Sequence, residues 1–214
     1  KLSREDARKT IVEDMSSKDL IDKIEDYTNS VGFSERGGVP IEHYLSDQWY
    51  MKMDTIAQPA LEAVSSGKIK FHPEHWVKTY NHWMKNIKDW CISRQLVWGH
   101  QIPVWYHKDD VEKIHVSIEG PADPENWTRE KDVLDTWASS WLWSFAVHSW
   151  PDKDKNLKTF YPTNTLVTGP DIIFFWVARM IMAGTKFLNE IPFKDVYFIS
   201  ILRDKDGKKF SKSL

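Results

Sequence analysis

The sequence has a single cysteine, Cys91, among its 214 residues. One thiol cannot form an internal disulfide or a thiolate-rich zinc site, and it is typical of a protein in a reducing, intracellular setting. Neither sign of charge dominates, because 29 basic and 31 acidic residues leave a formal net charge of −2. No global basic field therefore attracts a polyanion, and any contact with nucleic acid must come from local patches.

Long hydrophobic runs, repeats, low-complexity tracts and a signal peptide are also missing. The most apolar stretch, residues 172–183, contains Arg179 and is too short to span a bilayer. These features favour a cytoplasmic protein without a membrane anchor. The sequence also begins without Met and ends directly after a charged loop, so we expect a piece of a longer protein.

Residues 164–189 are the most informative stretch. A short β-prone run is followed by Gly169, Pro170 and Asp171 and then by a long apolar segment, which predicts a strand, a tight turn and a buried helix. In an open α/β sheet, ligands bind outside the carboxyl ends of the strands. Asp171 lies at that position, where it either caps the helix or binds a ligand hydroxyl. Its spacing alone does not decide between the two roles.

The remaining pattern predicts an α/β fold with a parallel sheet, preceded by a small α+β segment that ends near residue 46. We expect helices over residues 2–24, 54–65 and 73–95. Strands are expected over residues 23–31, 48–53, 68–72, 102–107, 113–118 and 195–202, with residues 126–132 irregular. The strand at 195–202 should pair in parallel with the strand before Gly169.

Several polar and aromatic residues allow more than one interpretation. Asp135, Ser139 and Ser140 lie in an apolar run and need hydrogen-bond partners. The 12 tryptophans are more often core than ligand platform, although Trp also lines pockets. His72 and His75 lack a third ligand, so we expect no metal site. The lysines of residues 203–213 either meet a phosphate or form a solvated charge run.

The last five-residue run resembles the KMSKS loop of class I aminoacyl-tRNA synthetases, with Phe in place of Met: Lys209-Phe210-Ser211-Lys212-Ser213. Four further segments agree in the family's order, at residues 46–53, 89–103, 132–140 and 168–180. The resemblance covers essentially the whole chain and is greatest to the valyl-tRNA synthetase family. His100 and Asp135-Thr136-Trp137 favour valine over the isoleucyl- and leucyl-tRNA synthetases, which share the architecture.

The resemblance implies that valine is activated by Mg²⁺-bound ATP to valyl-adenylate and then transferred to tRNA(Val). It implies a catalytic loop of Lys209, Ser211, Lys212 and Ser213, whose lysines stabilise the charge on pyrophosphate. The implied ATP-binding residues are Gly169, Asp171, Ile201, Leu202 and Lys212. The implied valine pocket consists of Trp98, Ile172 and Trp176, of which the last two are four residues apart and share a helix face.

The resemblance also implies the organisation of the chain. Residues 1–46 correspond to the exit segment of the inserted editing domain, and residues 47–214 to the C-terminal half of a Rossmann-like catalytic domain. The HIGH segment and the editing pocket are absent from this sequence, so we expect the isolated chain to be inactive and the full-length enzyme to be a monomer. Pro170, Ala138, Trp141 and Ile199-Ser200 depart from the residues usual in the family, and the last pair stands beside the expected adenine contacts.

Two other interpretations stay open. The chain could be a tRNA-binding or structural half-domain without activity of its own, with RNA contacts from Lys78, Lys85, Lys88 and Arg94. Such binding would depend steeply on salt. A nucleotide-binding α/β domain of unrelated chemistry is the other alternative.

Overall fold

The computed structural model describes residues 2–34, 37–152, 154–207 and 209–210. The chain forms two compact units, residues 1–46 and residues 47–214. In the first unit, helix α1 (Arg4–Ser17) begins after Ser3, whose side-chain oxygen accepts a hydrogen bond from the backbone N–H of Asp6. The helix ends earlier than expected, followed by Asp19 with a positive φ of 53°.

The strand predicted over residues 23–31 is wrong. Those residues contain no regular strand, and the only pairing described within the first unit is an isolated bridge between Phe33 and Pro40. Apolar side chains in this segment such as Ile24 and Val31 are exposed. A strand needs a partner for its backbone groups, and the described residues of this unit offer none to residues 23–31.

The second unit contains the predicted parallel sheet. Its strands lie in the order β2 (Lys70–His72), β10 (Asp195–Phe198) and β9 (Thr165–Thr168). Strand β10 pairs in parallel with both neighbours, with Phe198 opposite Thr168 at the carboxyl end. The α/β fold class and the parallel pairing of the last two strands are thereby confirmed.

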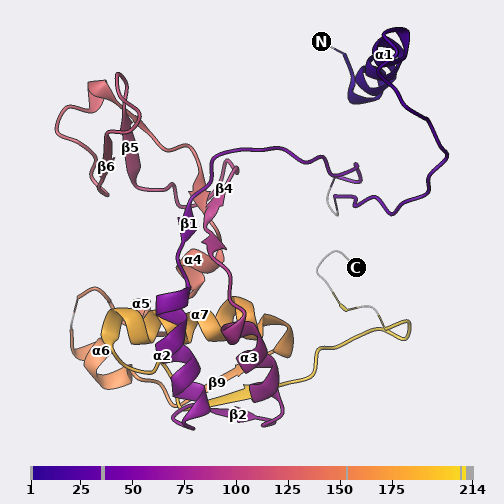
Figure 1. Cartoon of the computed structure of the whole chain (residues 1–214). Helices are drawn as coiled ribbons and strands as arrows, with labels where there is room; N and C mark the ends of the chain where they lie inside the picture. Colours follow the sequence, from indigo (N-terminus) through magenta and orange to yellow (C-terminus); the bar gives the residue numbers. More distant parts are fainter. Residues whose placement is uncertain (1, 35–36, 153, 208, 211–214) are drawn as a thin grey trace. The chain divides into compact units, whose positions relative to one another are not determined.

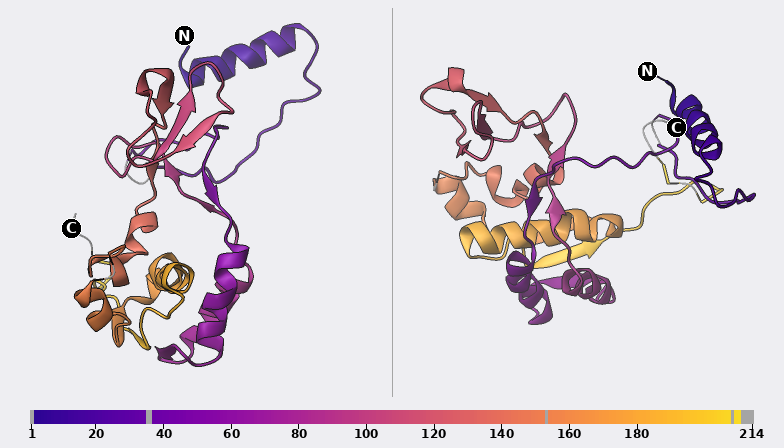
Figure 2. Two further views of the ribbon diagram at one scale, coloured as in Figure 1. Left: turned by 90° about the vertical axis from the view of Figure 1, so that its left-hand side faces the viewer. Right: turned by 45° about the horizontal axis from the view of Figure 1, so that its top comes forward.

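A continuous helical run follows β9 and lies beside the sheet (Figures 1 and 2). The sequence predicts a single buried helix here, but the run is not a uniform α-helix. A 3₁₀ turn, η2 (Pro170–Ile172), leads into a π-helical segment, η3 (Ile173–Ala178), then α7 (Arg179–Ala183) and a second π-helical segment, η4 (Gly184–Leu188). The i→i+5 pattern of a π-helix is rare and often marks functional sites.

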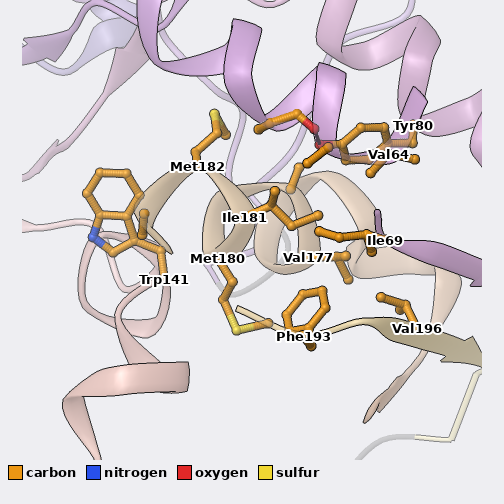
Figure 3. Close-up of a cluster of buried hydrophobic side chains, with 14 of the residues drawn as sticks. Val64, Ile69, Tyr80, Trp141, Val177, Met180, Ile181, Met182, Phe193 and Val196 are labelled. Carbon is orange, nitrogen blue, oxygen red and sulfur yellow. Dashed lines mark hydrogen bonds between the residues drawn. The ribbon is translucent and has the colours of Figure 1, made fainter. Parts of the chain in front are cut away.

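The core of the second unit forms around this run. Helix α2 (Asp54–Ser65) packs against α3 (Trp76–Lys85) and against α7, and the completely buried Val177 and Ile181 lie between these helices and the sheet. Figure 3 shows Val177 near Phe193 and Ile181 in the same cluster of buried side chains, with Tyr80 reaching in from α3. The prediction that residues 172–183 form a helix buried on several sides is confirmed, apart from its type.

The helix predicted over residues 73–95 ends at Lys85 instead. Strand β3 (Trp90–Cys91) pairs with β1 (Tyr50–Met51), and β4 (Ser93–Arg94) pairs with β8 (Val133–Leu134), both antiparallel. These partners lie about 40 residues away in sequence, so their hydrogen bonds override a local pattern that favours a helix.

A three-stranded antiparallel sheet has the order β6 (Ile114–Val116), β5 (Val104–His107) and β7 (Trp127–Arg129). The first two strands confirm the predicted ones, whereas β7 replaces part of the irregular segment expected at 126–132. The short helices of this part are η1 (Pro124–Asn126), α4 (Trp137–Ser140), α5 (Trp143–Ala146) and α6 (Lys155–Phe160). Among the described residues, no helix is both long and apolar enough to cross a membrane.

Candidate functional site

The carboxyl ends of β9 and β10 bring three of the predicted ATP-binding residues together. The backbone N–H of Ile199 bonds to the Thr168 carbonyl at 3.0 Å, so the chain leaves both strands at the same edge of the sheet. A Cβ added to Gly169 would lie 2.5 Å from Oδ1 of Asp171 and 3.6 Å from Cγ1 of Ile201. Gly169 therefore leaves the space that the Asp171 carboxylate occupies.

Lys209 reaches the same place from the charged loop. Its Nζ lies 2.6 Å from Oδ2 of Asp171, and both side chains are partly exposed, at 55% and 39%. The loop folds back on itself, since the Arg203 guanidinium donates to the Gly207 carbonyl at 2.8 Å and the Phe210 N–H bonds to the Leu202 carbonyl at 3.3 Å. Ser211, Lys212 and Ser213 lie outside the described residues.

Ile172 and Trp176, the predicted walls of the amino-acid pocket, are both half-buried in the helical run after β9. The Trp176 indole N–H donates to the Ser140 carbonyl at 3.1 Å. Trp98 is 93% exposed, so it lines no buried pocket here. Trp137 lies closer to this helical run, because its ring stacks on Phe175 with centroids 5.8 Å apart. The Asp-x-Trp spacing could have indicated this tryptophan as a candidate.

Asp135 is the residue whose role sequence analysis left open. Its carboxylate is buried and has three partners: the Trp90 indole N–H at 3.0 Å, Arg179 Nη1 at 3.4 Å and Arg94 Nη2 at 3.1 Å. The Arg179 guanidinium also stacks 3.7 Å above the Trp90 ring. Burial lowers the pKa of Arg179 to about 10, against the attraction of Asp135, so Arg179 stays charged at neutral pH.

These groups line a cavity of about 390 Å³ between α3, β3 and the helical run after β9. Aromatic rings of Trp90, Trp137 and Phe175 form part of its wall, together with the ion pair of Asp135 and Arg179. The cavity thus combines an apolar surface with a fixed pair of opposite charges.

The residues expected to contact tRNA differ in their availability. Lys78 and Lys85 on α3, and Lys88 after it, are exposed. The Arg94 guanidinium instead bonds to the carbonyls of Cys91 and Ser93, at 2.9 and 2.7 Å, in addition to Asp135. Arg94 is therefore held by the protein and is less available to a phosphate than the three lysines.

His72 has a partner within the fold. Its Nε2 lies 2.7 Å from Oδ1 of Asp195, and its ring stacks on Tyr197 with centroids 4.4 Å apart. Within the described ranges, no group of three His, Cys, Asp or Glu side chains could hold a metal ion.

Comparison with known proteins identifies the family. The model of the class I tRNA synthetases for isoleucine, leucine, methionine and valine matches residues 8–123 and 121–214. The chain belongs to this class I tRNA synthetase family. Valine–tRNA ligases of Chlorobaculum tepidum and Bacillus licheniformis are each 54% identical to it over the whole chain, and that of Borreliella burgdorferi is 50% identical. The resemblance predicted from the motifs is confirmed.

The chain spans about a quarter of the length of these curated relatives, 24% for the first two. A crystal structure of Mycobacterium tuberculosis methionyl-tRNA synthetase bound by methionyl-adenylate matches 87% of this chain and 32% of its own, with a TM-score of 0.58. The identity is 16%, so this likeness shows the fold alone.

Proposed function

We propose that the protein carrying this chain is a cytoplasmic valine–tRNA ligase. A valine carboxylate oxygen attacks the α-phosphorus of Mg²⁺-bound ATP, and the bond to pyrophosphate breaks. A hydroxyl at the 3′ end of tRNA(Val) then attacks the valyl carbonyl of the adenylate, and AMP leaves. The observation that carries this proposal is the 54% identity with valine–tRNA ligases in alignments that cover the whole chain.

The grouping of Gly169, Asp171, Ile201 and Lys209 supports an ATP site at the carboxyl ends of β9 and β10. In this proposal, Asp171 accepts hydrogen bonds from the ribose hydroxyls, and the backbone around Ile201 and Leu202 holds adenine. Lys209 and Lys212 stabilise the charge that develops on pyrophosphate, where a preformed cation is most effective. Ser211 and Ser213 shape the loop or bond to phosphate oxygens.

Ile172 and Trp176 form the valine pocket in this proposal. Trp137 is a better third wall than Trp98, because Trp137 stacks on the same helical run whereas Trp98 is almost fully exposed. Residues 1–46 are the exit segment of the editing insertion, and residues 47–214 the C-terminal half of the catalytic domain. Lys78, Lys85 and Lys88 are the exposed candidates for contact with tRNA, and Arg94 is the weaker one.

The test is amino-acid-dependent ATP–pyrophosphate exchange by the full-length protein carrying this sequence. Valine should support exchange, and Asp171→Asn should raise the KM for ATP about 10- to 100-fold, as expected for hydrogen bonds to a charged group. Asp54→Asn is the control, since Asp54 is an exposed carboxylate that bonds to the neighbouring Thr55 N–H. The isolated chain should show no exchange. Exchange by the full-length protein with another amino acid, but not with valine, would refute the proposal.

A further inference from the structure

A short segment from Asp135 to Ser140 contacts the helical run after β9 at three points. Asp135 pairs with Arg179, the Trp137 ring stacks on Phe175, and the Ser140 carbonyl accepts the indole N–H of Trp176. The contacted residues of the run lie within or directly after the π-helical segment η3. Residues 135–140 therefore hold the same turns of helix that carry the proposed amino-acid pocket.

The π-helical geometry makes these contacts necessary. A π-helical segment is rare because its geometry is less favourable than that of an α-helix, so surrounding structure must hold it. On its amino-terminal side, η3 follows the turn at Gly169 and Asp171. On its carboxyl-terminal side, Arg179 is held between the Asp135 carboxylate and the Trp90 ring. Movement at Arg179 would allow residues 173–178 to return to the i→i+4 hydrogen bonds of an α-helix.

Such a change would rotate the pocket residues. The residue at position i bonds to i+5 in a π-helix and to i+4 in an α-helix, so the direction of Trp176 relative to Ile172 depends on which pattern is present. Deletion of a buried ion pair's partner leaves an unpaired buried charge, which is a strong reason for a helix to shift. Asp135 and Arg179 are only 6% and 5% exposed.

We infer that Asp135 is a positioning residue for amino-acid selection. By holding Arg179 through the ion pair, it fixes the π-helical register of η3 and hence the directions in which Ile172 and Trp176 face the amino-acid side chain. Asp135 itself touches no substrate in this account. The inference rests on the proposed function of the same site, and it adds a specific determinant of selectivity to it.

The test uses the full-length protein and ATP–pyrophosphate exchange with valine and with 2-aminobutyrate, which is one methyl group smaller. In Asp135→Asn, the amide keeps an oxygen for the Trp90 N–H but loses the charge that holds Arg179. The kcat/KM ratio of valine to 2-aminobutyrate should fall at least about fivefold, out of the roughly 10- to 200-fold that one methylene supplies. The KM for ATP should change less than about twofold, because Asp171 and Lys209 lie outside the affected segment.

The matched control is Glu130→Gln. Glu130 also accepts hydrogen bonds, from the Trp49 indole N–H at 3.1 Å and from the Tyr106 hydroxyl at 2.8 Å, but both of these donors lie outside the helical run. Its replacement should leave the valine to 2-aminobutyrate ratio unchanged. A ratio in folded Asp135→Asn as high as in this control would overturn the inference and leave Asp135 a purely structural residue.

If Asp135→Asn loses its cooperative melting transition, Trp90→Phe decides instead. It removes the donor to Asp135 and keeps a ring beneath Arg179, so the ratio should fall by a smaller factor, and an unchanged ratio would overturn the inference. A wild-type protein that activates neither amino acid would refute the proposed function itself. If the wild type activates valine, and Asp135→Asn and Trp90→Phe both keep the wild-type ratio of kcat/KM for valine to 2-aminobutyrate, only the positioning role is refuted.

Discussion

Replacing Gly169 by Ala should damage ATP binding without damaging the fold. The backbone at Gly169 has φ −81° and ψ 148°, which any residue adopts, so the substitution carries no conformational strain. The new Cβ would however lie 2.5 Å from Oδ1 of Asp171, which is too close for two non-bonded atoms. Asp171 is exposed, so its carboxylate can turn away at little cost in stability.

The magnitude follows from what the carboxylate then loses. Hydrogen bonds to a charged group contribute about 1.5–3 kcal/mol each, so a displaced Asp171 should raise the KM for ATP about 10- to 100-fold. The free energy of unfolding should change by less than about 1 kcal/mol. The KM for valine should stay close to that of the wild type, because Ile172 and Trp176 are not displaced.

The assay is ATP–pyrophosphate exchange at varied ATP, together with urea unfolding. Gly32→Ala is the control, since a Cβ there meets only Cδ1 of Ile41 at an ordinary 3.5 Å. Because both changes act through one carboxylate, Gly169→Ala combined with Asp171→Asn should be little worse than Asp171→Asn alone. An unchanged KM for ATP, or fully additive effects in the double variant, would refute the reasoning.

Three further predictions concern the loop, the pH dependence and the core. Lys209→Met removes the ion pair on Asp171 and frees that carboxylate for the ribose hydroxyls. Adenosine, which has a ribose but no phosphates, should therefore inhibit exchange up to about fivefold more strongly. Weaker inhibition would contradict the pairing of Lys209 with Asp171. Burial alone would raise the pKa of Glu130, but hydrogen bonds from the Asp132 N–H, Tyr106 and Trp49 outweigh it and lower that pKa. This stabilisation is present above the ordinary pKa of 4.5 and is lost as the pH falls through the lower folded-state pKa. Between about pH 6 and pH 3.5 the free energy of unfolding should therefore fall more in the wild type than in Glu130→Gln. Equal falls in the two proteins would contradict this prediction. Ile181→Ala empties a completely buried position and should cost about 2–5 kcal/mol in denaturant unfolding, and a cost below about 1 kcal/mol would place Ile181 outside the core.

The strand, turn and buried helix around Gly169 were predictable because each signal is local. A β-prone run, a Gly-Pro-Asp turn and an apolar segment follow one another within residues 164–189. The helix type was not predictable. A segment that is apolar on every face has no alternation of apolar and polar residues, and only that alternation could distinguish 3.6 residues per turn from the wider turn of a π-helix.

Long-range pairing caused the other errors. Nothing near Trp90 and Ser93 in the sequence indicates that they pair with strands β1 and β8, so the helix predicted over residues 73–95 is too long. The three partners of Asp135 come from separate segments of the chain, and its need for partners was predictable while their identity was not.

Some of the expected site residues come together in the fold, and one of them does not. The resemblance implied Gly169, Asp171 and Lys209 as site residues, and the fold brings them together at one sheet edge. The resemblance also implied Trp98 as part of the amino-acid pocket, and its side chain is 93% exposed in the structure. An aromatic residue in a motif can be placed in a pocket only when the burial of its side chain is known.

The most direct test of the central claim is the charging of tRNA by the full-length protein that carries this sequence. It would be incubated with ATP, Mg²⁺, unfractionated tRNA and either labelled valine, isoleucine, leucine or methionine. The account predicts that valine is attached, to tRNA(Val), and that Asp171→Asn strongly reduces the rate. Attachment of another of these amino acids in preference to valine, or none at all by a folded protein, would contradict it.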